Sequence, residues 1–251
     1  MASFNEQQGS SRREDKALRI VLIVIFLGLG FAFVAKFAGP ELLKLYLKSG
    51  VGDCENIPIL CMTPEENIAK INIDKEYLSK LLINKFPPDL QIYLPNEFTV
   101  VKELITKVYY KKKKRVLGGA IIYLLYEKPD FFVDLFPQLK NRGIKDDYDF
   151  INRTMQAKLN EVKTLTDTFF VIMKGIFIPD LGEQKNVKMA TFLLQDKKGF
   201  INYNIGKKEN FFDCNVFDRQ RNFFKIYIKD KQASLDLDKV FVIISTVKKA
   251  E

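Results

Sequence analysis

The stretch FINYNIGKKENFFDCNVFDRQRNFFKIYI, residues 200–228, decides the fold class. It contains three apolar-rich runs that are separated by two short polar clusters: 200–205, 211–217 and 223–228 around 206–209 and 218–222. In the last run Phe224, Ile226 and Ile228 alternate with other side chains, a period of two that is typical of a strand with one buried face. Short polar clusters between such runs predict tight turns. The stretch therefore predicts an antiparallel meander.

The elements around this meander extend it in both directions. Upstream, residues 169–178 and 187–194 are strongly apolar, and we expect two further strands there. Downstream, Asp236 or Asp238 should cap a last helix, because aspartate accepts hydrogen bonds from the free N–H groups of a helix start. The apolar stripe of that helix should pack across the sheet; it comprises Leu237, Val240, Ile243, Ile244 and Val247.

The middle of the chain predicts a β-hairpin with a basic tip. Residues 104–110 and 120–126 are the expected strands, and shorter strands at residues 90–94 and 98–101 precede them. The tip comprises Lys111, Lys112, Lys113, Lys114 and Arg115. Two interpretations stay open, a solvated end that discourages edge pairing and a contact patch for lipid headgroups or a partner.

Three helical regions are expected outside the strands. The first spans residues 64–84 with an interruption near residue 72, because Thr63 and Glu66 form a capping box around Pro64. The second spans residues 129–143, and the third spans residues 146–162. The sequence thus predicts an α+β domain in which helices flank a mainly antiparallel sheet as an α-β-α sandwich.

A transmembrane helix is expected at residues 18–38, LRIVLIVIFLGLGFAFVAKFA. Its only charged residues, Arg19 and Lys36, stand near its two ends, and about twenty such residues span a bilayer. The alternative is a cleaved signal peptide, because a charged region precedes the apolar run. No small-x-small cleavage site follows the run, so an uncleaved anchor is the preferred interpretation.

The anchor divides the chain into four parts. Residues 1–17 are the expected cytoplasmic tail, 18–38 the anchor, 39–62 a stalk and 63–251 an extracytoplasmic domain. The orientation follows from the positive-inside rule, since four cations precede the apolar core of the span: Arg12, Arg13, Lys16 and Arg19.

The three cysteines lie in two settings. Cys54 and Cys61 would close a small disulfide loop in the stalk, which an extracytoplasmic compartment permits. Cys214 alternates with Phe212 and Val216 on an expected strand and should face the core. The alternative is that all three are small buried thiols.

The composition excludes several classes of function. The 251 residues contain no histidine, which removes Ser-His-Asp triads, Cys-His dyads and HExxH zinc sites. The acidic group Asp146, Asp147 and Asp149 is explained by capping at a helix start. We therefore expect no catalytic residue, no cofactor and no bound metal.

The net charge of +9 does not predict a nucleic-acid partner. Lysine outnumbers arginine, so the surface lacks the bidentate forks that favour phosphate recognition. No helix-turn-helix, zinc-finger or RNP pattern is present in the sequence. A weak attraction to anionic lipid headgroups suits a tethered basic domain better.

The order of the expected elements over residues 90–248 resembles that of PsbP-like proteins. That order is a proline-led strand, a hairpin, helices, a meander and a closing amphipathic helix that ends in Ile244-Ser-Thr-Val247. The resemblance implies the α-β-α sandwich of small extracytoplasmic and lumenal accessory proteins, and hence a binding or accessory role. No diagnostic motif matches, so no functional residue is carried over.

Three functions remain open, the last of which is an enzyme without histidine that would work through carboxylates, lysine, tyrosine or cysteine alone. The preferred one is a non-enzymatic, single-pass protein whose outer domain is an interaction or accessory module for an envelope or secretion assembly. The alternative is a carrier that holds a lipid or other apolar ligand between sheet and helices. The bilayer, through residues 18–38, and an envelope protein are the expected partners.

Sidedness can be tested with a membrane-impermeant thiol reagent applied to intact cells. If the domain is extracytoplasmic and Cys54 is paired with Cys61, both residues should react only after an external reductant is added. Labelling that requires permeabilisation but no reductant would show reduced thiols in the cytoplasm, and the topology would be inverted.

Overall fold

The computed structural model describes residues 39–68, 71, 73–86, 90–96, 98–104, 107–112, 120–178, 186–231 and 233–249. The expected tail and membrane anchor, residues 1–38, lie outside these ranges, as do Lys113, Lys114 and Arg115 of the expected hairpin tip. Lys111 and Lys112 are described only as backbone of a strand. Within the described ranges, no helix has both the length and the apolar character needed to cross a bilayer.

An eight-stranded sheet forms the centre of the molecule, in the order β1-β7-β8-β9-β10-β6-β5-β4. Its strands pair antiparallel except that β1 runs parallel to β7. The expected meander and hairpin are confirmed, because β7 to β10 and β5 to β6 pair in sequence order. The bounds are β1 Glu66–Ile68, β4 Phe98–Leu104, β5 Lys107–Lys112, β6 Ala120–Glu127, β7 Lys188–Leu193, β8 Lys197–Ile205, β9 Asn210–Asp218 and β10 Phe223–Asp230.

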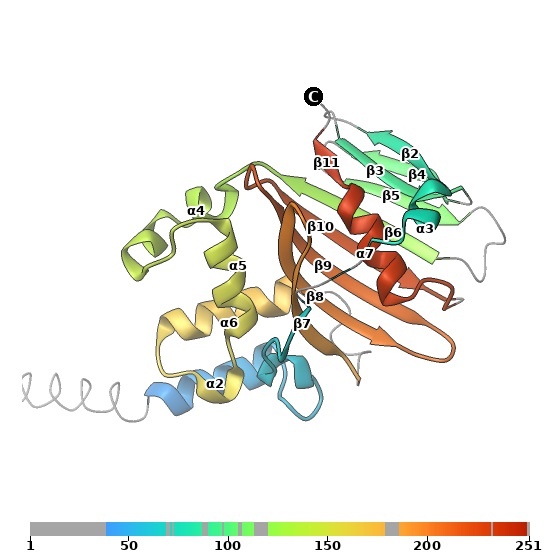
Figure 1. The fold of residues 1–251 in the computed structure, drawn as a ribbon. Helices are drawn as coiled ribbons and strands as arrows, with labels where there is room; N and C mark the ends of the chain where they lie inside the picture. The colour runs from blue at the N-terminus through green and yellow to red at the C-terminus, as the bar shows by residue number, and fades with distance from the viewer. Residues whose placement is uncertain are drawn as a thin grey trace, which may run out of the picture.

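A three-stranded sheet lies over one end of the larger one (Figure 1). Its order is β11-β3-β2, with β2 at Leu81–Phe86, β3 at Leu90–Pro95 and β11 at Lys248–Lys249. The expected strand at residues 90–94 is thus confirmed as β3, although it belongs to the second sheet. The short strand β11 follows the last helix directly, so the C-terminal end of the described chain forms one edge of this sheet.

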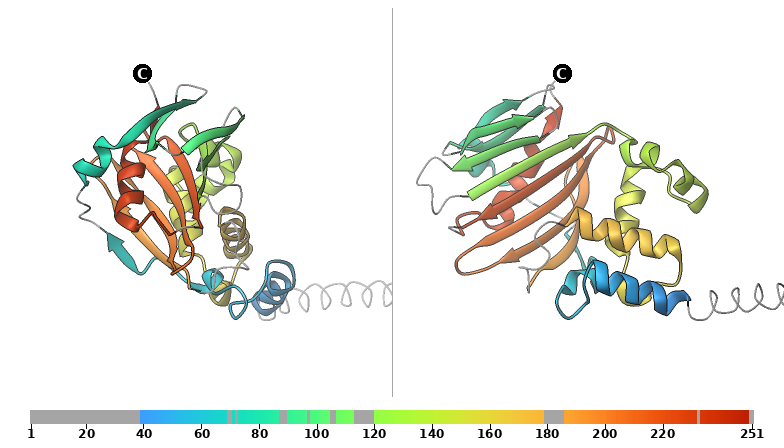
Figure 2. Two further views of the ribbon diagram at one scale, coloured as in Figure 1. Left: turned by 90° about the vertical axis from the view of Figure 1, so that its right-hand side faces the viewer. Right: turned by 180° about the vertical axis from the view of Figure 1, so that it is seen from behind.

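Helices cover both faces of the central sheet (Figures 1 and 2). On one face α7 (Leu237–Thr246) packs with the small sheet against Phe212, Cys214 and Ile226. On the other face α4 (Phe131–Leu135), α5 (Asp147–Gln156) and α6 (Leu165–Phe177) enclose a cluster rich in phenylalanine. The prediction of an α+β fold with sheets flanked by helices is confirmed, and Asp236 caps α7 by accepting from Lys239 N.

The expected stalk, residues 39–62, packs against the domain. Helix α2 (Gly39–Gly50) buries Leu47 in a cluster with Leu60 and Val171. The 3₁₀ helix η1 (Pro58–Cys61) belongs to the same cluster. Because these apolar side chains need a partner, the segment folds back along α6 instead of extending away. Cys54 and Cys61 form a disulfide in this segment, with Cα atoms 5.7 Å apart.

The strand expected at residues 169–178 is wrong, since α6 occupies this position. Thr164 and Asp167 form a capping box that starts the helix. The run is apolar on most sides because α6 is wedged between the sheet and α2, which bury Phe170, Val171 and Phe177. A short run that is apolar all round does not distinguish a buried helix from a strand.

The helix expected at residues 64–84 is also wrong. This segment contains β1, the single-turn helix α3 (Lys75–Ser79) and β2. The chain after Thr63 is extended because it pairs with the edge of β7, where Glu65 N donates to Met189 O at 3.1 Å. A ladder with a strand far away in sequence overrides the local capping signal.

Two expected helices are shorter than predicted. The first is interrupted at Pro137 into α4 and the 3₁₀ helix η2 (Pro137–Arg142), because proline lacks the N–H that would continue α4. Gly143 is the C-cap of η2, with φ of +85°, a left-handed conformation that favours glycine. The helix expected at residues 146–162 ends at Gln156 and is followed by the 3₁₀ helix η3 (Leu159–Glu161).

Replacing Gly199 with alanine should lower the free energy of unfolding by about 1–3 kcal/mol or more. An added Cβ would lie 1.9 Å from the Asn215 carbonyl oxygen of the paired strand and 2.9 Å from Phe192 Cζ. Urea unfolding of the detergent-solubilised full chain measures the loss. Gly50→Ala is the matched control, because nothing lies within 4 Å of its added Cβ, and equal stability of the two variants would contradict the packing described.

Candidate functional site

Lys174 on α6 is a fully buried cation inside an apolar layer. Its Nζ donates to three carbonyl oxygens: Met62 O at 2.5 Å, Ala157 O at 2.9 Å and Met155 O at 3.0 Å. Two of these carbonyls belong to the C-terminal end of α5, where helical C=O groups have no partner within the helix. Burial, and to a smaller extent Lys158, lower the pKa of Lys174 to about 7. The side chain therefore caps α5 and holds it to the chain after η1.

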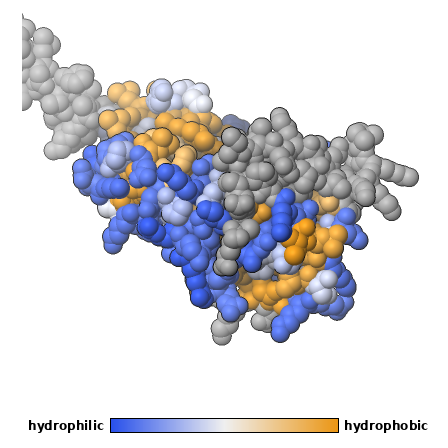
Figure 3. All heavy atoms as spheres, turned by 90° about the horizontal axis from the view of Figure 1, so that it is seen from above, coloured by the Kyte–Doolittle hydropathy of each residue, from blue (hydrophilic) through white to orange (hydrophobic). Residues whose placement is uncertain are grey.

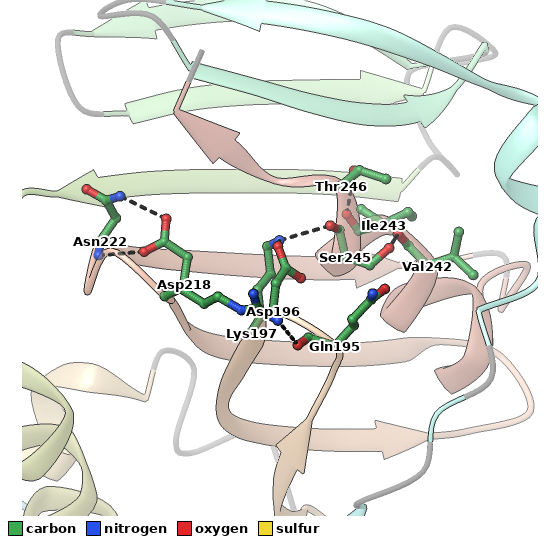
Figure 4. Close-up of polar contacts among 10 residues, drawn as sticks. Gln195, Asp196, Lys197, Asp218, Asn222, Val242, Ile243, Ser245 and Thr246 are labelled. Carbon is green, nitrogen blue, oxygen red and sulfur yellow. Dashed lines mark hydrogen bonds and ion pairs between the residues drawn. The ribbon is translucent and has the colours of Figure 1, made fainter. Parts of the chain in front are cut away.

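Lys197 at the start of β8 plays the same part for α7 (Figure 4). Its buried Nζ donates to Ser245 O at 3.0 Å and pairs with Asp196 at 2.8 Å. Ser245 lies in the last turn of α7, so the lysine satisfies a carbonyl at the C-terminal end of that helix. The β7–β8 turn is thereby fastened to α7.

Lys225 on β10 is the third cation of this kind. Its Nζ donates to the carbonyl oxygen of Phe177, which is the last residue of α6. It also forms an ion pair with Asp213 Oδ1 at 2.7 Å. Asn202 Nδ2 donates to Asp213 Oδ2 at 3.2 Å, and Asn215 Oδ1 accepts from Lys225 at 3.4 Å. These four side chains form a polar cluster on the face of the sheet that α6 covers.

The polar cluster has spare hydrogen-bonding capacity. Asn202 Oδ1 and Asn215 Nδ2 are buried and have no hydrogen-bond partner among the described residues. Buried amide atoms of this kind usually find a partner. The cluster nevertheless pairs its one carboxylate with its one ammonium group, which is the arrangement of a structural ion pair with satisfied charges.

The acidic residues singled out from the sequence act as helix caps. Asp146 accepts from Asp149 N at the start of α5. Asp147 is buried and accepts from Phe132 N at 2.9 Å and Val133 N at 3.1 Å at the start of α4, while burial raises its pKa. Cys214 lies in the core, and burial raises the pKa of its thiol well above the usual range, so the protonated form is favoured. Among the described residues, no three acidic or cysteine side chains converge as they would around a metal ion.

A groove with a volume of about 720 Å³ runs between α5 and α6. Its lining combines polar and apolar surface, with Arg142, Arg153 and Asp149 among the side chains. The groove is open, and Arg153 pairs with Asp167 across it at 3.3 Å. An open groove lined by several charged side chains does not favour the apolar ligand of a lipid carrier.

Among the exposed apolar side chains of the described residues, two groups lie at opposite ends of the molecule. One is the outer face of α2, formed by Leu42, Leu45 and Tyr46, and the other is the edge strand β2, with Leu82 and Ile83. The views agree that α2 and β2 lie far apart (Figures 1 and 2). Figure 3 shows apolar atoms gathered at the helical end, where the chain enters the described residues.

Sequence reasoning missed the three lysine caps. Lys174 and Lys225 are single lysines inside the apolar runs FFVIMKGIF and FFKIYI, and that isolation is their only signal. Lys197 lies in the polar turn DKKG and carries no such signal. The sequence does not show which carbonyl oxygen any of the three lysines meets. The predicted basic tip, in contrast, has no described side chain, so its two interpretations stay open.

Comparison with known proteins does not assign a family. No protein-family model and no curated protein matches the chain. One solved structure that matches is a crystal structure from Bacteroides thetaiotaomicron VPI-5482 at 1.50 Å resolution, with 8% sequence identity and a TM-score of 0.27. The match covers 68% of this chain and 48% of the other, so the chain spans about half the length of that protein. A likeness this low relates neither fold nor function, and the PsbP-like resemblance stays a prediction.

Lys174 should make stability rise with pH between about 7 and 8.5. The pKa of Lys174 is lowered to about 7 in the folded chain and lies near 10.4 in an unfolded one. The unfolded state therefore binds more protons across this pH range, and the free energy of unfolding increases as the pH rises. In urea unfolding, the free energy of unfolding of the wild-type chain should rise by up to about 1.4 kcal/mol per pH unit relative to that of Lys174→Met. The exposed Lys163→Met variant is the control, and parallel pH profiles of wild type and Lys174→Met would contradict the lowered pKa.

Proposed function

We propose that this chain is a single-pass, non-enzymatic membrane protein whose extracytoplasmic domain binds another envelope protein as an accessory module of an envelope or secretion assembly. Residues 18–38 are the anchor, with the N-terminus in the cytoplasm. The α-β-α sandwich of PsbP-like accessory proteins is the finer fold that goes with this role. The proposal needs a surface for the partner, and the edge strand β2 supplies it.

The observation that carries the proposal is the apolar edge of β2. Leu82 is 56% exposed and Ile83 is 53% exposed, and as neighbours in a strand they point to opposite faces of the small sheet. Among the described strands β2 pairs only with β3, so its other edge has no strand partner within the described residues. An apolar open edge is a template for an added strand, which a partner supplies through main-chain hydrogen bonds.

The location of β2 supports the same role. It lies at the end of the molecule opposite α2, the helix that follows the proposed anchor (Figure 2). A domain held at its α2 end therefore presents β2 away from the attachment point. Lys174 and Lys197, meanwhile, donate to carbonyl oxygens at the ends of helices, and Asp147 accepts from N–H groups at the start of α4. This structural use of buried ionisable groups favours a binding role over catalysis.

Site-specific photo-crosslinking in the native membrane tests the partner surface. A photo-crosslinking amino acid in place of Ile83 should capture a discrete envelope protein, identified by mass spectrometry. The same amino acid in place of Leu193 on β7, which is 52% exposed, should not capture it. Leu82→Asp should weaken capture at position 83, because a charge on the edge disfavours strand addition, while Leu193→Asp should leave it unchanged.

The outcome against the proposal is equally specific. If positions 83 and 193 give the same adducts, or if neither gives one in membranes where the full chain is intact, β2 is not a docking edge. An adduct at position 83 that survives Leu82→Asp unchanged would also count against strand addition.

A further inference from the structure

Helix α2 has apolar side chains on two opposite faces. Leu43 and Leu47 point toward the domain, where they pack with Leu60 and Val171. Leu42, Leu45 and Tyr46 form the other face and are 57%, 64% and 66% exposed. Their spacing of i, i+3 and i+4 places them side by side on the helix surface. A soluble helix keeps its second face polar, so this outer face calls for a partner of its own.

The position of α2 directly after segment 18–38 indicates which partner covers this face. The apolar segment 18–38 ends at Ala38, and α2 begins at Gly39, so no linker separates the two. A helix of 12 residues is about 18 Å long, and every part of α2 therefore stays within that distance of the segment's end. Gly39 and Pro40 stand at the junction, where proline cannot continue the hydrogen bonding of a preceding helix and a change of direction is favoured.

We propose that α2 lies along the bilayer surface, with Leu42, Leu45 and Tyr46 inserted at the boundary between headgroups and acyl chains. The inference rests on the proposed anchor and extends it, since it assigns the orientation of the whole domain. Because Leu43 and Leu47 hold α2 to the domain core, a helix fixed on the membrane fixes the domain with it. The occupant of the outer face is thus lipid.

The chemistry of α2 fits an interfacial helix. Tyrosine is enriched where one end of a side chain is apolar and the other is wet. Lys44 and Lys48 lie on the flank between the two apolar faces, and Lys44 pairs with Glu41 at 2.8 Å. Long cationic side chains on such a flank reach the headgroup region while their stems cover apolar surface.

The chain contains no tryptophan, so one introduced residue reports on a single position. The full chain is reconstituted with one copy per nanodisc, in lipids that carry bromine either near the headgroup end or near the terminus of the acyl chains. Leu45→Trp should lose emission most strongly to bromine near the headgroup end, because interfacial helices insert roughly 5–10 Å. Tyr46→Trp is a second, more conservative reporter of the same face.

Two controls separate this inference from the proposed anchor. Phe26→Trp, in the middle of segment 18–38, should be quenched most strongly by bromine near the chain terminus. Leu82→Trp on β2, which replaces a side chain that is 56% exposed, should keep its emission in every disc because β2 lies at the opposite end of the molecule.

Each of the other outcomes contradicts either the interfacial position of α2 or the anchor. If Phe26→Trp is quenched while Leu45→Trp and Tyr46→Trp are not, the anchor stands and the interfacial position of α2 is wrong. A blue shift at positions 45 and 46 without quenching would show that protein covers this face. Equal quenching at positions 45 and 82 would show that the membrane does not select α2. Loss of quenching at position 26 would overturn the anchor itself.

Discussion

Burying both faces of β9, the strand between β8 and β10, constrains the rest of this molecule. Residues 210–217 of β9 are all buried, so neither face of this strand meets water. One face needs α7 and the small sheet, and the other needs α4, α5 and α6. Helices that end against a covered sheet leave carbonyl groups without solvent, and each such group must find a donor. Lys174, Lys197 and Lys225 supply those donors at the ends of α5, α7 and α6.

This use of the buried cations changes how the ionisable groups are interpreted. A buried lysine with a lowered pKa, or an aspartate paired with lysine inside a sheet, would be a candidate for chemistry if it faced a cavity. Here the lysines face backbone carbonyls, and Asp147 faces the N–H groups at the start of α4. The described surface also exposes apolar side chains, among them those of α2 at one end and of β2 at the other. The proposed membrane contact and the proposed partner contact are assigned to these two ends.

The candidate surfaces and the fold differ in how far they could be predicted. Period-two alternation in residues 200–228 located β8, β9 and β10, and Asp236 located the start of α7, because both signals are local. The sequence predicts a strand where α6 lies, because the burial of α6 against the sheet and α2 removes the polar side that marks a surface helix. The capping signal at Thr63 failed for the opposite reason, since a ladder with β7 outweighed it. The exposed face of α2 needed the structure, because leucines on both sides of a helix do not show which side is covered.

The sequence by itself determined the α+β class, the meander, the closing helix and the expectation of an anchor at residues 18–38. These depend on periodicity, caps and apolar length, which neighbouring residues set. Tertiary structure alone decided that residues 66–68 form a strand, that residues 39–62 pack on the domain and that three lysines cap three helices. Each of these features joins residues far apart in the chain, and their partners exist only once the sheet has brought those residues together.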